Sequence, residues 1–300
     1  MNKNRLGKSD LYVSELSLGC MSLGTEQAKA QDIIDHAINA GINYLDTADL
    51  YDKGRNEEIV GQALKGRRDQ VVLATKVGNH LKENGEWFWD PSKAYIVNQV
   101  KESLRRLNTD YIDLYQLHGG TIDDPIDETI EAFEQLQQEG LIRYYGISSI
   151  RPNVIREYVK KSNIVSVMMQ YSLFDRRPEE TVLDMLHEND ISVVARGPMA
   201  KGMLSDQAST KVEEKGKNGY LDYTYEELVA MVDKLASKNN TVQSLQYVLQ
   251  HPAVASAVFG ASTAEQLENN LSYQHAAPLT EQQYKSLQTI SKPLTYDKHR

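Results

Sequence analysis

The stretch AKAQDIIDHAINAGINYLD, residues 28–46, joins a helix pattern directly to a strand pattern. Its apolar residues between Ile33 and Ile38 fall on one helical stripe, and Gly41 stands where a left-handed residue commonly ends a helix. The following INYLD is typical of a short buried strand that finishes on Asp46. A helix followed at once by a strand is the repeating unit on which the fold prediction depends.

The same unit recurs along the chain. Further helix patterns cover residues 56–66, with Asn56 as the expected N-cap, and residues 91–108 and 124–140. Eight strands are predicted, nearly all separated by helical patterns: SELSLG (14–19), INYLD (42–46), VVLATK (71–76), YIDLYQLH (111–118), LIRYYGIS (141–148), VSVMMQ (165–170), ISVVAR (191–196) and SAVFG (256–260).

Strand–helix alternation predicts a parallel sheet, because parallel neighbours need a crossover and the crossover is usually a helix. Eight such units favour a closed (β/α)₈ TIM barrel that forms a single domain over residues 1–300. An open doubly wound sheet is the alternative. The glycine spacing in LGCMSLG (18–24) does not match the dinucleotide fingerprint G-x-G-x-x-G. Residues 77–92 and 203–222 are predicted to be long loops of the kind that serve as lids or binding segments.

Composition narrows the class of protein. Lys and Arg total 33 against 42 Asp and Glu, a formal charge of −9 that disfavours nucleic acid as a partner. Cys20 is the single cysteine, which excludes an internal disulfide and fits a reducing cytosol. No run approaches the roughly 20 apolar residues of a membrane span, residues 1–14 lack the apolar core of a signal peptide, and no zinc-type spacing is present. We therefore expect a cytoplasmic protein without a metal or a membrane partner.

Polar residues close most of the predicted strands. In a barrel of this kind the active site lies at the carboxyl ends of the strands, so these residues are the candidate site. Tyr51 follows Asp46 in the adjoining turn. The others are Asp46, Lys76, His118, Ser148, Ser149, Gln170 and Arg196.

Four of these residues form a device for protonating a carbonyl oxygen. A free tyrosine has a pKa near 10 and is a slow general acid unless a neighbour stabilises its phenolate. Lys76 would supply that positive charge, and Asp46 would hold the lysine and offset its burial. His118 would donate a hydrogen bond to the substrate oxygen or tune Tyr51. Each residue alone could have a purely structural role, as Asp46 would if it only formed the turn. A different enzyme class is also open, a Schiff-base aldolase that would use Lys76 to bind its substrate covalently.

At this point the chain resembles the aldo-keto reductase family over nearly its whole length, in a bacterial-type form with a short C-terminal tail. GINYLDTADLYDKGRNEEIVGQAL (41–64), VVLATKVG (71–78) and YIDLYQLH (111–118) resemble the segments that carry the family's Asp, Tyr, Lys and His. YYGISS (144–149), MMQYSLF (168–174), RGPMAKGML (196–204) and VFGASTAEQLENNL (258–271) resemble its cofactor-binding segments. The resemblance implies a barrel that binds extended NADP(H) without a Rossmann domain and transfers hydride to a carbonyl. It also implies that Asp46, Tyr51, Lys76 and His118 are the catalytic tetrad.

The resemblance assigns further residues to the cofactor. Ser148, Ser149 and Gln170 would bind the nicotinamide carboxamide, and Arg196 stands where many relatives place a stacking aromatic ring. The pyrophosphate would lie on the loop formed by Arg196, Gly197, Pro198, Met199, Lys201 and Gly202. The adenosine end would be bound by Gly260, Ser262, Thr263, Gln266, Asn269 and Asn270. Gly19, Cys20 and Met21 would line the floor of the pocket. The resemblance favours NADP(H). NAD(H) is the alternative, because the adenosine segment has no Lys or Arg for a 2′-phosphate and would bind it only with neutral donors.

The substrate is expected to be a small carbonyl compound. Trp87, Phe88 and Trp89 would supply an apolar wall, and the short segment after the last helix implies an open site of broad specificity. A monomer or weak homo-oligomer is expected. The alternative function is a nucleotide-sensing regulatory subunit on the same fold with little turnover.

Overall fold

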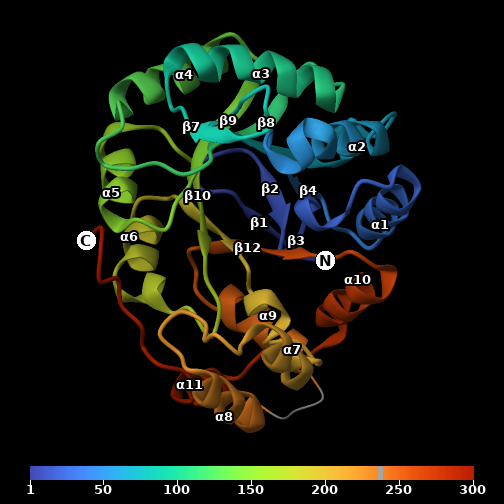
Figure 1. Ribbon diagram of the computed structural model, residues 1–300, viewed down its shortest axis with the longest axis vertical. Coiled ribbons are helices and arrows are strands. Elements are labelled where there is room, and N and C mark those ends of the chain that lie inside the picture. Colours follow the sequence, from blue (N-terminus) through green and yellow to red (C-terminus); the bar gives the residue numbers. More distant parts are fainter. Residues whose placement is uncertain (236–238) are drawn as a thin grey trace.

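A closed barrel of eight parallel strands forms the centre of the molecule (Figure 1), as predicted from the alternating pattern. The computed structural model describes residues 1–235 and 239–300. The barrel strands run in the order of the sequence, and each pairs with the next until the last pairs with the first. They are β3 (Leu16–Gly19), β4 (Tyr44–Asp46), β5 (Val72–Val77), β8 (Ile112–Leu117), β9 (Ile142–Ser148), β10 (Ser166–Gln170), β11 (Ser192–Arg196) and β12 (Val254–Gly260).

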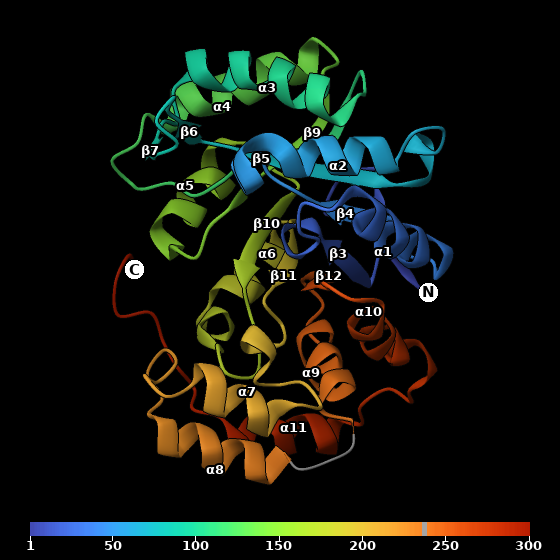
Figure 2. The same cartoon turned by 45° about the vertical axis from the view of Figure 1, so that its right-hand side comes forward.

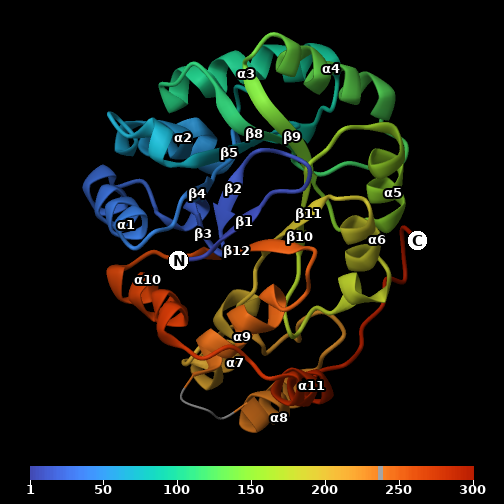
Figure 3. The same cartoon turned by 180° about the vertical axis from the view of Figure 1, so that it is seen from behind.

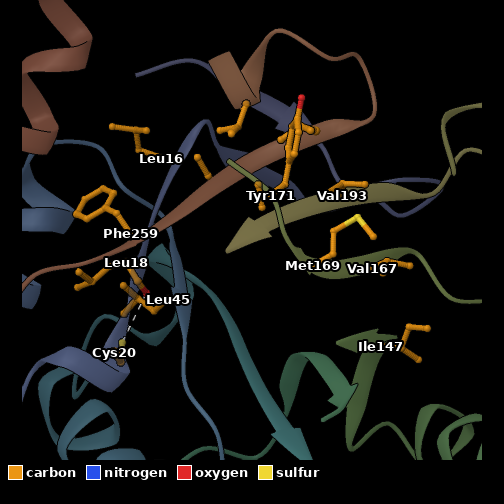
Figure 4. Packing of buried hydrophobic residues seen from close by; sticks show 14 of the residues in the cluster. Leu16, Leu18, Cys20, Leu45, Ile147, Val167, Met169, Tyr171, Val193 and Phe259 are labelled. Atoms are coloured by element: carbon orange, nitrogen blue, oxygen red, sulfur yellow. Dashed lines mark hydrogen bonds between the residues drawn. The ribbon is translucent and has the colours of Figure 1, made fainter. Parts of the chain in front are cut away.

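Helices surround the strands (Figure 1) and bury one face of each strand. They are α1 (Gln27–Asn39), α2 (Arg55–Ala63), α3 (Lys93–Leu107), α4 (Ile126–Gln138), α5 (Pro152–Lys161), α6 (Val182–Glu188), α7 (Ala208–Lys215), α8 (Tyr225–Leu235), α9 (Asn240–Leu249), α10 (Ala264–Leu271) and α11 (Glu281–Ile290). The main apolar cluster lies between strands and helices; it includes Leu45, Val193 and Phe259, which Figure 4 shows among their neighbours. In Figure 2, α7, α8 and α11 lie together on one side of the barrel. Among the described residues, no helix is both long and apolar enough to cross a membrane.

A second apolar cluster fills the barrel interior. Side chains alternate between the two faces of a strand, so Tyr44, Ala74, Leu114, Met168 and Val194 all point inward and pack on one another. The same alternation sends their neighbours outward into the helix layer.

A short antiparallel hairpin closes the amino end of the barrel. It consists of β1 (Lys3–Arg5) and β2 (Tyr12–Ser14), and Figure 3 shows it lying across the strands. Its residues Leu6, Leu11 and Val13 are buried in the interior cluster. The barrel is therefore a packed core that is closed at its amino end, and its open end is the carboxyl end.

The structure corrects three local predictions. Residues 77–92 hold a two-stranded hairpin, β6 (Asn79–Leu81) with β7 (Trp87–Trp89), and residues 203–222 include helix α7. Asn56 does not cap α2, because the chain enters that helix through Gly54 in a left-handed conformation. Its buried side chain instead accepts a hydrogen bond from the Thr47 hydroxyl at 2.7 Å and donates to the Cys20 carbonyl at 2.9 Å.

Candidate active site

Three neighbouring strands bring the expected catalytic residues to one rim. Asp46 follows the inward-facing Tyr44 by two positions, and Lys76 follows the inward-facing Ala74 in the same way. His118 lies just past β8, where its backbone N–H donates to the Val77 carbonyl at 2.7 Å. The period of two along each strand turns these side chains to the inner face, and their places at the strand ends bring them to the same carboxyl rim.

Lys76 is the centre of the site. Its ammonium donates to Asp46 Oδ2 at 2.6 Å, to the Thr47 carbonyl at 2.8 Å and to the Tyr51 hydroxyl at 3.3 Å. The lysine side chain is 1% exposed and the Asp46 side chain 6%. A buried charge is tolerated only when it is paired and hydrogen-bonded, and these three contacts use all three ammonium protons.

Gln116 belongs to this site and was missed by sequence reasoning. Its amide donates to Asp46 Oδ1 at 3.3 Å, on the carboxylate oxygen that Lys76 leaves free. Gln116 lies in β8 two residues before His118, so an inward-facing polar residue one step deeper in the same strand was the available signal.

Tyr51 is presented by a turn with an uncommon backbone. Asp52, Lys53 and Gly54 all adopt left-handed conformations, with φ of 48°, 57° and 89°. The Tyr51 ring packs edge-on against the His118 ring, with centroids 5.7 Å apart and an interplanar angle of 81°. The Lys76 ammonium lies 5.0 Å from the centre of the Tyr51 ring.

Burial and charge shift the proton affinities of the site. Burial alone would lower the pKa of Lys76, but the Asp46 carboxylate and the Tyr51 hydroxyl reverse this, and the pKa of Lys76 is raised. Burial raises the pKa of the Asp46 carboxyl, with Lys76 and Gln116 acting in the opposite direction. Burial, with the charges of Lys76 and Arg196, lowers the pKa of His118 to about 3. His118 is thus a neutral imidazole at physiological pH, and its Nδ1 is buried without a partner among the described residues.

The residues expected at the nicotinamide lie on the opposite part of the rim. Gln170 and Arg196 are paired in the β10–β11 ladder, and the Arg196 guanidinium donates to Gln170 Oε1 at 3.2 Å. The Gln170 amide nitrogen donates to Asp175 Oδ2 at 2.9 Å and to the Tyr220 hydroxyl at 3.1 Å. Ser148 ends β9, and the buried Ser149 accepts a hydrogen bond from the Arg151 N–H. Asp175 and Tyr220 are additional members of this group that sequence reasoning missed.

The loop after β11 carries Lys201, and two further lysines of α7 lie beside it. Gly197 is exposed in a left-handed conformation, and a Cβ built there would have no neighbour within 4 Å. Ala200 and Lys201 are also left-handed, while Pro198 is buried and Met199 half-buried. The Lys215 ammonium donates to the Lys201 carbonyl at 2.9 Å, and the Lys211 side chain packs on Gly202. The exposed Lys201 beside the open backbone at Gly197 suits a phosphate group.

The expected adenosine-end residues follow β12. The Ser262 N–H and hydroxyl both donate to Gln266 Oε1, and the Thr263 hydroxyl caps α10 by accepting from the Gln266 N–H at 3.2 Å. Asn269 is exposed, whereas Asn270 is buried and donates to the Gln266 carbonyl at 2.8 Å.

The carboxyl end of β3 lies beside the expected adenosine-end segment, and a glycine stands at that end in both β3 and β12. Gly19 pairs with Gly260, and a Cβ on Gly260 would lie 2.3 Å from the Ser22 hydroxyl. Met21 is 63% exposed, whereas Cys20 is fully buried and offers a ligand no accessible surface.

The three aromatic residues of β7 differ in their surroundings. Trp87 and Phe88 are exposed, and Phe88 stacks on His80 with ring centroids 4.7 Å apart. Trp89 packs on Gly78 and Gly119, which follow Val77 and His118, and donates to Asp124 Oδ2 at 3.0 Å. Trp89 therefore fixes the hairpin to the strand ends that carry the site. Among the described residues, no group of three or more His, Cys, Asp or Glu side chains could hold a metal ion.

A parallel (β/α)₈ barrel with its polar cluster at the carboxyl end defines the class of the protein as a barrel enzyme. The model of the Aldo/keto reductase family matches residues 15–292. The uncharacterized oxidoreductase YqkF of Bacillus subtilis (strain 168) is 62% identical over the full length of both chains. The NADH-specific methylglyoxal reductase of Escherichia coli (strain K12) is 30% identical, over 90% of this chain and 93% of that one.

The solved structures agree with these relatives. The holo form of aldo-keto reductase AKR11C1 from Bacillus halodurans superposes with a TM-score of 0.95, at 56% identity over 100% of this chain and 99% of that one. The chain belongs to the aldo-keto reductase family of NAD(P)H-dependent oxidoreductases.

Proposed function

We propose that this protein reduces aldehydes and ketones to alcohols with NADPH, and that Tyr51 is the general acid. The observation that supports this most strongly is the position of the Lys76 ammonium, 3.3 Å from the Tyr51 hydroxyl and 2.6 Å from Asp46. A cation beside a phenol stabilises the phenolate that forms when the phenol gives up its proton.

The four residues would share the proton chemistry. Bound NADPH would supply hydride to the carbonyl carbon, while Tyr51 donates the proton to the carbonyl oxygen. Asp46 would keep Lys76 charged and in place, with Gln116 holding the second carboxylate oxygen. His118 is neutral, so its single N–H can donate a hydrogen bond to the substrate oxygen without adding a charge.

The opposite part of the rim would hold the cofactor. Ser148, Ser149 and Gln170 would bind the carboxamide, the loop from Arg196 to Gly202 the pyrophosphate, and the Ser262–Asn270 segment the adenosine end. The donor set fits such a group: the exposed loop combines Lys201 with open backbone at Gly197, and Gln266 has an amide nitrogen with no hydrogen bond among the described residues.

We propose a modest preference for NADPH over NADH. The preference rests on the likeness of the chain to its family. It is modest because the segment after β12 would bind a 2′-phosphate only with neutral donors, and charge-assisted hydrogen bonds are about twice as strong as neutral ones. One relative is named as NADH-specific, so the ratio of kcat/KM for NADPH and NADH is the decisive measurement.

Turnover with NADPH and 4-nitrobenzaldehyde tests the function. We expect the wild-type protein to consume NADPH only when the aldehyde is present. Tight nucleotide binding without turnover on a broad carbonyl panel would instead support the sensing subunit. Borohydride trapping of a substrate adduct on Lys76, without any need for NADPH, would support the aldolase.

The substrate is proposed to be a small carbonyl compound that enters an open site beside Trp87 and Phe88. We also propose a cytoplasmic location, consistent with a single, buried cysteine, and a monomer or weak homo-oligomer.

A further inference from the structure

The turn that presents Tyr51 has to be held by its surroundings. Asp52 and Lys53 carry side chains in the left-handed region, which costs about 1–2 kcal/mol per residue for most amino acids. Gly54 packs so closely on Arg106 of α3 that an added Cβ would lie 2.9 Å from the arginine Cδ. Contacts below the turn therefore decide where the Tyr51 hydroxyl lies.

Asp49 makes the central contact. Its backbone N–H donates to the carbonyl of Lys76 at 3.2 Å, which joins the turn directly to the strand that carries the lysine. Its carboxyl is buried, at 4% exposure, and points to α3, where the Tyr95 hydroxyl lies 3.3 Å from Asp49 Oδ2. Asp49 Oδ1 makes no hydrogen bond of good geometry among the described residues, although the Gln99 side chain faces the carboxyl and acts against the rise of its pKa.

Counting protons favours a neutral carboxyl at this position. The Tyr95 hydroxyl lies 3.3 Å from the Asn79 carbonyl as well as 3.3 Å from Asp49, and it has one proton for the two acceptors. If Asp49 is protonated, its own O–H can donate to Tyr95 and the Tyr95 proton is left for Asn79. The chain of two hydrogen bonds then runs unbroken from the turn to the β6–β7 hairpin.

The charges around Asp49 act in the same direction. Glu57 of α2 is also fully buried, and its ion pair is with Arg106, whose Nε donates to the Glu57 carboxylate at 2.7 Å. The Thr75 hydroxyl donates to the same carboxylate at 2.6 Å. The other groups that face Asp49 are Tyr95 and Gln99 of α3, together with Tyr115 of β8. Burial, and then the charge of Glu57, raise the pKa of Asp49 to about 7, while Arg106, Gln99 and Tyr95 oppose the shift.

We propose that Asp49 is a positioning residue for Tyr51, a neutral buried acid that fixes the turn to β5 and α3. This rests on the proposed function, in which Tyr51 is the proton donor. Ionisation of Asp49 leaves Tyr95 one proton short and places a second carboxylate beside Glu57. The turn then loosens, and turnover falls as the pH rises through neutrality.

The direction of the pH effect follows from the raised pKa. The contribution of Asp49 to stability is fully present below the pKa of an unfolded aspartate, and it is lost as the pH rises through about 7. Asn at this position cannot ionise, so D49N should not show the loss.

Hydrogen–deuterium exchange of residues 47–55, corrected for intrinsic rates, tests this without any need for turnover. In the wild type we expect protection at pH 6 to fall at least threefold by pH 8, and in D49N to stay constant. D113N makes the same chemical change at a buried carboxyl at the other end of the barrel, held by Arg68 and Arg143, and should lower stability without altering the pH dependence of this peptide. Y95F is the second variant, and should reduce protection at pH 6.

The turnover assay with NADPH and 4-nitrobenzaldehyde then separates the two proposals. We expect kcat of the wild type to fall between pH 6 and 8 and that of D49N to remain within twofold over the same range. Equal pH dependence of exchange in the wild type and D49N, or full protection in Y95F, would overturn the role of Asp49. A wild type that shows the exchange effect but reduces no carbonyl would support the role of Asp49 in holding the turn and would count against the proposed function alone.

Discussion

Replacing Lys76 by Met should abolish most turnover and destabilise the fold, for two separable reasons. The ammonium lies 3.3 Å from the Tyr51 hydroxyl. At an effective dielectric constant of about 20, a unit charge at that distance stabilises a phenolate by about 5 kcal/mol. The proton is only partly transferred in the transition state, so we expect a loss in kcat of about 10³-fold, or about 4 kcal/mol.

The loss of stability in K76M comes from Asp46, the buried partner of the missing lysine. Without Lys76, the buried Asp46 keeps only its weaker contact with Gln116, and removing one member of a buried ion pair typically costs about 3–5 kcal/mol. The double variant D46N/K76M removes both charges, so it should regain most of the unfolding free energy but none of the turnover.

Single-turnover reduction of 4-nitrobenzaldehyde and urea unfolding measure the two effects. Lys285→Met, which removes an exposed lysine on α11, is the matched control and should change both values little. A K76M variant with more than a tenth of the wild-type kcat, or recovery of turnover in D46N/K76M, would refute this explanation.

Three further predictions concern the same site. Tyr51→Phe should leave NADPH affinity, measured by fluorescence titration, within about twofold while removing most turnover, and comparable turnover would exclude Tyr51 as the acid. His118 is neutral in the folded protein and protonates more readily in the unfolded chain, so its contribution to stability is lost as the pH falls from about 6.5 toward 3. Denaturant titrations at pH 7 and 4.5 measure this loss of unfolding free energy. The loss should be smaller in His118→Gln than in the wild type by up to about 2 kcal/mol. Gly54→Ala should lower kcat because its Cβ meets Arg106, whereas Gly66→Ala, equally left-handed but with open space around it, should only lower the melting temperature; equal kcat in both variants would contradict the role of the turn.

The barrel could be predicted because its signals are local and repeated. Most strands carry a polar residue at or next to their carboxyl end, two positions after a buried one, as in Ala74 and Lys76, and that period is visible in the sequence. Placing Asp46, Lys76 and His118 on one rim then needed only the rule that parallel strands present their carboxyl ends together.

The buried polar partners could not be predicted in the same way. Asp49 stands in a turn, where Asp is usually a turn former, and nothing in the sequence tells that α3 brings Tyr95 over it. The inward-facing position of Gln116 in β8 was a signal, but its role depends on a contact with Asp46, 70 residues away in the chain. The β6–β7 hairpin did have a signal, because the pair Asn84 and Gly85 is common in hairpin turns and is followed by the aromatic run 87–89, which favours a strand.

The β1–β2 hairpin closes the amino end of the barrel with Leu6, Leu11 and Val13, so the barrel is open at one end only. Any molecule that reaches Lys76 must enter at the carboxyl end and leave at the same end. An alcohol product and an oxidised nucleotide would have to leave through that same opening.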